Sequence, residues 1–236
     1  MLKVLDLFSG IGGFSLGLER AGMETVAFCE IDKKARLVLN KHWPDVPVFE
    51  DVSTLTKDAL DARGISVDVI CGGFPCQDIS LAGKGAGLEG ERSGLWFQFH
   101  RLIKEIKPQY AIIENVSALR NRGLDQVLRS LAEIGYDAEW HCIPASAVGA
   151  PHRRDRIWIV AYTVQSRLQG QRQITSRISE ELKDLSYSRW WETEPAVGRV
   201  ANGVPNRVDR LKQLGNAVLP QIPELIGRAI IKNMGE

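Results

Sequence analysis

The sequence predicts an α/β fold in which a mostly parallel, twisted sheet carries helices on both faces. Two observations support this prediction: short apolar strands alternate with amphipathic helices over most of the chain, and the first strand runs directly into a glycine-rich turn. The 236 residues are 44% hydrophobic and 25% charged, which is typical of one large globular domain with a core of its own.

The alternation of strands and helices is regular through the first half of the chain. Each expected helix spaces its apolar residues three and four apart, and Gly22, Pro44 and Pro108 mark positions where helices end. The predicted strands are residues 2–8, 24–29, 47–49, 67–71 and 110–113, and the predicted helices are residues 14–21, 33–42, 92–106 and 124–134.

The C-terminal part of the chain is less regular. Residues 138–143 and 157–162 are predicted to be two paired strands. The pattern then breaks in residues 163–212, which are rich in Arg, Gln, Ser and Glu and indicate a helix at residues 178–185. A final helix is predicted over residues 221–233, because its apolar residues fall on one helical face.

Charge is distributed unevenly along the chain. Residues 1–145 contain 16 Lys and Arg against 20 Asp and Glu, whereas residues 146–236 contain 14 against 9. A basic C-terminal third is typical of proteins that bind nucleic acid, although a solvated arginine-rich face gives the same composition.

The cysteine and hydropathy patterns exclude several classes of protein. Cys29, Cys71, Cys76 and Cys142 have neither CxxC nor Cys/His ligand spacing, so we expect no disulfide framework, no structural metal and a reducing, cytoplasmic environment. No apolar run reaches 18 residues, and an acid and a glycine cluster come too early for a signal peptide. A membrane-spanning or secreted protein is therefore not expected.

Acidic residues are predicted at the ends of the first three strands, where open α/β sheets bind their ligands. These are Asp6, Glu30 and Asp51, and Glu30 lies 20 residues after Gly10, about where a dinucleotide fold keeps the acid that binds the ribose. The turn at residues 10–13 is not GxGxxG, the pattern that binds the pyrophosphate of a dinucleotide. A site for the ribose without one for the pyrophosphate favours S-adenosylmethionine over NAD. A tight turn flanked by solvated acids is the alternative.

Cys76 lies in a constrained loop after the fourth predicted strand. The preceding Gly-Gly-Phe-Pro sequence, residues 72–75, is expected to hold it in the cleft, where a nucleophile has exposure and a fixed direction. The other three cysteines are interpreted as buried apolar residues. The glycine-rich stretch at residues 80–87, which contains Lys84, is predicted to form a lid over the substrate.

Two further sets of charged residues are candidates for the site. Glu114 follows the fifth strand, where burial would raise its pKa and allow it to donate a proton to a ring nitrogen; a helix N-cap is the alternative. Residues 152–156, His-Arg-Arg-Asp-Arg, open the last predicted strand and are suited to binding phosphate or carboxylate.

Taken in order, these motifs resemble those of the DNA (cytosine-5) methyltransferase family, and most closely its compact bacterial and phage members. The resemblance runs over residues 2–162 and 211–232 and implies a Rossmann-like fold that uses S-adenosylmethionine to methylate cytosine in double-stranded DNA. The residues that carry it are Asp6–Gly13, Phe74–Gln77 (FPCQ), Glu114–Val116 (ENV), Arg154–Arg156 and Gly215–Val218 (GNAV).

The resemblance implies catalytic roles for four residues. Cys76 would attack C6 of a cytosine flipped out of the duplex, and Glu114 would hydrogen-bond N3 and the exocyclic amine. Arg154 and Arg156 would steady the base and its neighbouring phosphate. Covalent attack is chemically necessary, because C5 of cytosine is too weak a nucleophile to accept a methyl group unaided.

The resemblance also implies a site for S-adenosylmethionine, with S-adenosylhomocysteine as product and no metal. Glu30 would bind the ribose and Asp51 the adenine amino group. The expected cofactor-binding residues are Asp6, Phe8, Gly10, Gly12, Glu30, Ile31, Asp51, Val52, Pro75, Leu95, Asn216 and Ala217.

We divide the chain into a catalytic and cofactor-binding core (1–162), a short basic target-recognition insert (163–210) and a C-terminal segment that returns to the core (211–236). The insert is much shorter than the target-recognition domain usual in the family. Residues 153–212 contain 12 Lys and Arg against 7 Asp and Glu, which suits contact with phosphates. The insert could read a short DNA target itself, or a partner could read the bases, and a cognate restriction enzyme is a further possible partner. We expect a monomer that is associated with the nucleoid.

Three alternative functions stay open beside DNA methylation. One is methylation of cytosine C5 in RNA on the same scaffold, although the FPCQ form favours DNA. Another is a catalytically silent DNA-binding protein, which a Cys76→Ser comparison would distinguish. The last is a nicotinamide-dependent dehydrogenase, which the imperfect glycine turn and the Cys76 loop argue against.

Overall fold

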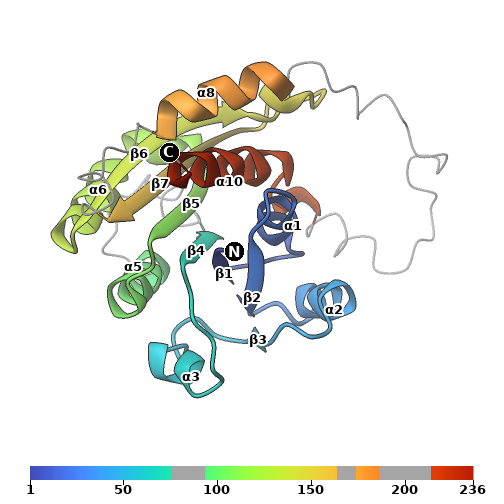
Figure 1. Cartoon of the computed structure of the whole chain (residues 1–236), viewed down its shortest axis with the longest axis vertical. Coiled ribbons are helices and arrows are strands. Elements are labelled where there is room, and N and C mark those ends of the chain that lie inside the picture. The colour runs from blue at the N-terminus through green and yellow to red at the C-terminus, as the bar shows by residue number, and fades with distance from the viewer. Residues whose placement is uncertain (76–93, 164–173, 186–213, 236) are drawn as a thin grey trace.

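A seven-stranded sheet forms the centre of the molecule (Figure 1). This computed structural model describes residues 1–75, 94–163, 174–185 and 214–235. The strand order is β3-β2-β1-β4-β5-β7-β6, with the first five strands parallel and β7 antiparallel to both of its neighbours. The strands are β1 (Lys3–Leu7), β2 (Glu24–Cys29), β3 (Val48–Phe49), β4 (Val69–Gly73), β5 (Tyr110–Val116), β6 (Tyr136–Pro144) and β7 (Asp155–Thr163).

Helices cover both faces of the sheet, as predicted. In the part of the chain that the structure describes, no helix is both long enough and apolar enough to cross a membrane. The helices are α1 (Gly13–Arg20), α2 (Lys33–His42), α3 (Lys57–Asp61), α5 (Gly94–Ile106), α6 (Leu124–Glu133), α8 (Ile174–Leu185) and α10 (Gln221–Met234), with 3-10 turns η3 (Ser117–Asn121) and η4 (Ala145–Val148).

Alternate side chains of each strand enter two separate core layers. Leu5 and Leu7 of β1 pack with α3, α5 and α6 on one face, whereas Val4 packs with α1, α8 and α10 on the other. Trp96 of α5 and Trp158 of β7 are the largest buried side chains, one in each layer. Each fully buried Leu, Ile or Phe contributes about 1.5–3 kcal/mol, so both faces stabilise the sheet.

The reversed direction of β7 brings its first residues to the carboxyl edge of the parallel strands. In the β5–β7 pair, Arg156 lies opposite Val116 and Trp158 lies opposite Glu114. The arginine-rich residues that precede β7 therefore reach the same edge as the ends of β1, β2, β4 and β5. This edge is where ligands of open α/β sheets bind.

The C-terminal segment returns to pack beside the first helix. Figure 1 shows α10 between α1 and α8, and both helices contact it. The approach to α1 depends on glycine: a Cβ at Gly17 would lie 2.2 Å from the carbonyl oxygen of Pro220, and one at Gly13 would lie 2.5 Å from that of Val218. The missing side chains let the segment from 214 to 235 lie directly on α1.

The predicted pairing of residues 138–143 with 157–162 is confirmed as the antiparallel pair β6–β7. Differences are confined to short elements and to element ends. Helix α3 was not predicted, because its five residues are too few to show a period; the Thr56 hydroxyl caps it by accepting from the amide of Ala59. Helix α8 begins four residues earlier than predicted, where the amide of Ile174 donates to Glu139 across the sheet edge.

We expect Gly17→Ala to destabilise the fold by about 2 kcal/mol, because the added methyl group collides with the Pro220 carbonyl and forces α10 away from α1. Gly94→Ala is the matched control, since its Cβ would meet no atom within 4 Å; we expect a neutral or slightly stabilising effect from the better helix propensity of alanine. Urea unfolding followed by circular dichroism measures both variants. Equal stability of the two would contradict the close packing of α1 on the C-terminal segment.

Candidate active site

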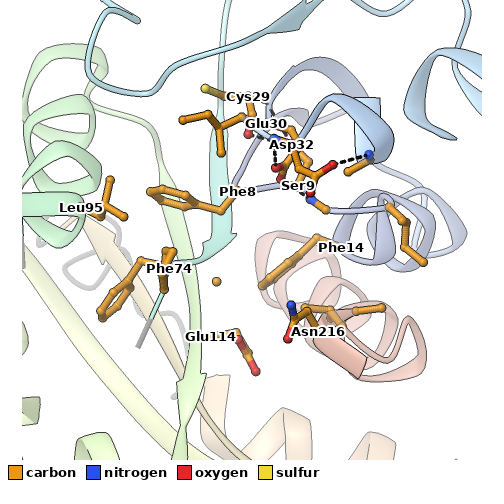
Figure 2. A pocket seen from close by; sticks show the side chains of 18 of the residues that line it. Phe8, Ser9, Phe14, Cys29, Glu30, Asp32, Phe74, Leu95, Glu114 and Asn216 are labelled. Carbon is orange, nitrogen blue, oxygen red and sulfur yellow. Dashed lines mark hydrogen bonds between the residues drawn. The ribbon is translucent and has the colours of Figure 1, made fainter. Parts of the chain in front are cut away.

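A cavity of about 470 Å³ opens at the carboxyl edge of the sheet. It lies where β1 and β4 are neighbours. From this point the parallel strands follow in chain order towards each edge of the sheet, β1 to β3 on one side and β4 to β5 on the other. Figure 2 shows Glu30 and Asp32 towards one end of the cavity, Glu114 and Asn216 towards the other, and Phe8 between them. Its volume is within the range of about 300–1,000 Å³ typical of small-molecule sites.

Most of the site residues predicted from the sequence line this one cavity. Three do not: Asp6 and Gly12 lie behind its wall, and Cys76 is outside the described residues, bonded to Pro75, the last described residue before a gap. The predicted lid at residues 80–87 falls in the same gap. The predicted residues that line the cavity are Phe8, Gly10, Glu30, Ile31, Asp51, Val52, Pro75, Leu95, Glu114, Arg154, Arg156, Asn216 and Ala217.

Glu30 closes the first turn from the end of β2. One carboxylate oxygen accepts from the amide of Gly10 and the other from the amide of Asp32, both at 2.7 Å. The side chain is 8% exposed, so these two bonds satisfy a nearly buried charge. Each oxygen keeps a further lone pair for a ligand hydroxyl. Glu30 thus fixes the turn and presents an acceptor to the cavity.

Phe8 enters the cavity from a strained backbone position. It follows β1 with a φ of 53°, which is uncommon for a residue with a side chain. Its ring stacks on Phe99 of α5, with the ring centroids 6.3 Å apart. Such strain persists only where the surroundings determine it, and it is concentrated at functional sites. The ring gives the middle of the cavity a flat apolar wall.

Asp51 provides a carboxylate at the rim of the cavity. It accepts from the amide of Ser53 at 2.8 Å, and hydrogen bonds from Ser53 hold its pKa below the ordinary value for aspartate. The next residue, Val52, is buried and lines the cavity beside it. This end of the site therefore combines an ionised acceptor with an apolar surface.

Asp6 was expected at the cofactor site, and the structure places it elsewhere. It lies inside β1 rather than at the end of the strand, and its side chain is completely buried facing α1, where Ser15 Oγ donates to it at 2.8 Å. Burial, with a smaller contribution from Glu30, raises the pKa of Asp6 to about 7. The physical reason is the period of two along a strand: Asp6 shares the face of Val4, away from the opening.

Gly12 also supports the turn from behind rather than lining the cavity. Its φ is 85°, and a Cβ there would lie 2.6 Å from the indole ring of Trp43. Trp43 is itself held by Glu19, whose carboxylate accepts from the indole N–H at 2.8 Å. Glycine is required at this position both for the backbone conformation and for the close approach of Trp43.

At the other end of the cavity Glu114 pairs with Arg156. Arg156 Nε lies 2.9 Å from Glu114 Oε1. Burial raises the pKa of Glu114 above its ordinary value, while the positive charges of Arg156 and Arg154 oppose that rise. A Cβ at Gly73 would lie 2.6 Å from Glu114 Oε2, so the glycine that ends β4 leaves the space that the carboxyl group fills. The carboxyl group of Glu114 is thereby fixed in the same cavity as Phe74 and Pro75.

Arg154 reaches across the cavity edge to the C-terminal segment. Its guanidinium donates to the carbonyl oxygens of Gly215, at 2.5 Å, and Ala217, at 3.1 Å. The backbone of Arg154 has a φ of 29°, another uncommon conformation for a residue with a side chain. Asn216, Ala217 and Val218 line the cavity, so this segment forms one of its walls.

Several lining residues were not among the predicted site residues. Asn115 is buried and its side-chain amide donates to the carbonyl of Phe74 at 3.0 Å, which ties the end of β5 to the loop after β4. Phe14 was interpreted as a core residue of a helix, and a helical period alone does not distinguish the two roles. Cys29 also faces the cavity, but burial and nearby acids raise its pKa to about 12, so its thiol is unreactive.

The arrangement suits a ligand that is apolar in the middle and polar at its ends. Carboxylates at the β2 and β3 ends accept hydrogen bonds, Phe8 and Leu95 offer apolar surface, and the Glu114–Arg156 pair can protonate and hold a second molecule. Within the described ranges, no three His, Cys, Asp or Glu side chains come together as a metal site.

Comparisons with known proteins show what the chain is similar to. A family model described as C-5 cytosine-specific DNA methylase matches residues 2–203. The chain is 36% identical over 168 residues to Type II methyltransferase M2.BsuMI of Bacillus subtilis (strain 168), and 34% identical over 219 residues to Orphan methyltransferase M.Rho11sI of Bacillus phage rho11s. These matches cover 68% and 84% of this chain but only 42% of each relative, so the chain spans less than half of their length.

The fold is also similar to that of a crystal structure from E. coli described as a prophage-encoded DNA modification methyltransferase. The two chains superpose with a TM-score of 0.70 over the full length of both, at 19% sequence identity. At this identity the similarity concerns the fold alone. It agrees with the Rossmann-like architecture expected from the sequence.

The buried carboxyl group of Asp6 should make stability depend on pH. Its pKa is raised from 3.8 to about 7, so between these values the folded state binds a proton that the unfolded state does not. The free energy of unfolding should therefore fall as pH rises from 5 to 8, by about 3 kcal/mol more in the wild type than in Asp6→Asn. Urea unfolding at the two pH values measures this difference. The exposed Asp125→Asn variant should behave as the wild type, and parallel curves for the wild type and Asp6→Asn would contradict the buried acid.

Removing the positive charge beside Glu114 should raise its pKa further. We expect Arg156→Gln to shift the carboxyl pKa upward, because burial then acts without its strongest opposing charge. Carbon-13 NMR of labelled glutamate carboxyl groups measures the titration, and Glu114→Gln assigns the signal. A pKa that stays constant or falls would show that the ion pair does not control the protonation of Glu114.

Proposed function

The chain belongs to the C-5 cytosine-specific DNA methylase family, and from this premise we propose that it transfers a methyl group from S-adenosylmethionine to C5 of cytosine in double-stranded DNA. The observation that carries the proposal is a single cavity with two chemically different ends. One end holds the carboxylates of Glu30 and Asp51, and the other holds the Glu114–Arg156 pair next to Pro75, to which Cys76 is bonded.

The cavity residues fit S-adenosylmethionine. Glu30 retains acceptor capacity for the ribose hydroxyls, Asp51 is an ionised acceptor for the adenine amino group, and Phe8 offers a flat apolar surface to a ring. Asn216 and Ala217 would enclose the cofactor from the C-terminal segment. When bound, the cofactor supplies a methyl group on a positively charged sulfur, which is open to attack by a carbon nucleophile.

Cys76 would make C5 of the cytosine nucleophilic. Its thiolate forms a bond to C6, and the electron pair displaced from the C5–C6 double bond is stabilised through N3, where Glu114 shares its proton. Once C5 carries the methyl group, loss of the C5 proton and cleavage of the bond between Cys76 and C6 restore the double bond and release the thiolate. Burial raises the pKa of Glu114 above its ordinary value, and this direction of shift favours the protonated form that the role requires.

Arg156 would position Glu114 and the base. Its Nε holds one carboxyl oxygen of Glu114, which leaves the other oxygen to face a ligand, and its guanidinium has further donors for the carbonyl of a pyrimidine. Chemistry on C5 within a duplex requires that the base be flipped out of the stack. The lid predicted at residues 80–87 would cover the flipped base.

Recognition of DNA would involve the basic segment from 163 to 210. Its net positive charge suits phosphate contacts, which provide affinity without sequence information. Within the described residues, α8 of this segment packs against α10 and β6, so part of it belongs to the core rather than to a separate reader. The rest of the segment is small. It would therefore read a short target sequence, or a partner protein would read the bases.

Expression in cells that lack their own cytosine methylation, followed by bisulfite sequencing of host DNA, tests the proposed function. We expect cytosines protected from conversion with the wild type, at sites whose flanking bases identify the target. Cys76→Ser should reduce protection to background, because serine is a far weaker nucleophile at neutral pH. Cys142→Ser is the matched control and should protect as the wild type does, because Cys142 does not line the cavity and is exposed; the expectation that it is buried was wrong.

Two results would count against this function. Protection that persists in Cys76→Ser would exclude covalent attack by that residue. No protection by a soluble wild type that binds S-adenosylhomocysteine would exclude a stand-alone DNA enzyme, and RNA or a required recognition partner would then be the leading alternatives.

A further inference from the structure

We infer that Arg154 is a positioning residue for the cofactor wall rather than a contact of the base or its phosphate. This inference rests on the proposed function and assigns a new role within the same site. Both arginines that flank Asp155 were expected to steady the base. The structure gives them different partners: Arg156 holds Glu114, whereas Arg154 holds the main chain of the C-terminal segment.

The two bonds of Arg154 are spaced around one cavity residue. Its two terminal nitrogens donate to the carbonyls of Gly215 and Ala217, which are the residues on either side of Asn216. A planar guanidinium that makes two such bonds fixes both the position and the rotation of the intervening peptide. Asn216 lines the cavity between these bonds, so Arg154 determines how Asn216 faces a ligand.

The far side of the same segment is held by close packing. A Cβ at Gly13 would lie 2.5 Å from the carbonyl oxygen of Val218, so residue 218 rests directly on the start of α1. The segment from 215 to 218 is thus held by α1 at one end and by Arg154 at the other. Without the arginine, the segment would lose its two hydrogen bonds on the cavity side and keep the α1 contact.

The backbone that carries Arg154 is itself fixed. The carbonyl of the preceding residue, Arg153, accepts from the amide of Ala145 at 2.7 Å, and β7 begins at the following residue. The φ of Arg154 is 29°, which is unusual for a residue with a side chain. This indicates that the surroundings impose the direction of the Arg154 side chain. Arg156 lies only two residues further along the chain. The end of the cavity that holds Glu114 and the wall that holds Asn216 are therefore joined through one short, rigid stretch, residues 154–156.

The consequence is a coupling between the two halves of the site. A guanidinium that is engaged by two carbonyls contributes little to DNA affinity, but its loss frees Asn216 and weakens the cofactor site. Arg154→Gly is the most informative variant, because glycine accepts the positive φ and removes only the side chain. Arg154→Lys retains the charge but lacks the two-pronged geometry.

Isothermal titration calorimetry with S-adenosylhomocysteine tests the inference on the full chain. We expect Arg154→Gly to weaken binding about tenfold, within the range for contacting residues, and Arg154→Lys to recover only part of the loss. Arg153→Gln, at the exposed neighbouring arginine that does not line the cavity, should bind S-adenosylhomocysteine within twofold of the wild type. Thermal unfolding of each variant checks that the fold is retained.

A double-mutant cycle with Asn216→Ala distinguishes positioning from general damage. If Arg154 acts through Asn216, most of the tenfold effect of Arg154→Gly should disappear when Asn216 is already alanine. An equal loss in both backgrounds, or binding by Arg154→Gly within twofold of the wild type, would overturn the inference and leave the proposed function intact. Failure of the wild type itself to bind S-adenosylhomocysteine would overturn both.

Discussion

The antiparallel position of β7 beside β5 is the constraint on which the site depends. If β7 ran parallel to β5, its first residues would lie at the opposite edge of the sheet, and neither Arg154 nor Arg156 could reach the cavity. The reversal places Arg156 against Glu114 and Arg154 against the C-terminal segment. The antiparallel strand β7 therefore brings positive charge to the carboxyl edge of the sheet, where acidic residues lie at or near the ends of parallel strands.

The acidic residues of the region differ because their surroundings differ. Glu30 is nearly buried but has an amide donor on each oxygen, and Asp51 is half-buried with donors from Ser53. Glu114 is largely buried with arginines as partners, and Asp6 is completely buried, with the hydroxyl of Ser15 as a donor. The same chemical group is thus suited in turn to accept hydrogen bonds from a ligand, to donate a proton or to form part of the core.

The sequence predicted the strand and helix alternation and placed Glu30, Asp51 and Glu114 at one edge, because strand ends and turns leave local signals. The prediction that Asp6 faces the cofactor site was wrong, although the sequence contained the relevant signal. Side chains alternate along a strand, so Asp6, two residues after Val4, shares the face of Val4 that packs on α1. The contact between Arg154 and Gly215 joins residues 61 positions apart and has no local signal. Its detection required the three-dimensional structure.

The packing of α10 on α1 has a consequence for the order in which the protein becomes competent. The first 163 residues contain every strand of the sheet, yet one wall of the cavity comes from residues 216–218. A chain truncated before Asn216 would lose this wall and also α10, whose apolar side chains cover one face of the sheet. The enclosure of the cavity and the completion of the core therefore depend on the same segment, which is the last of the described residues to be synthesised.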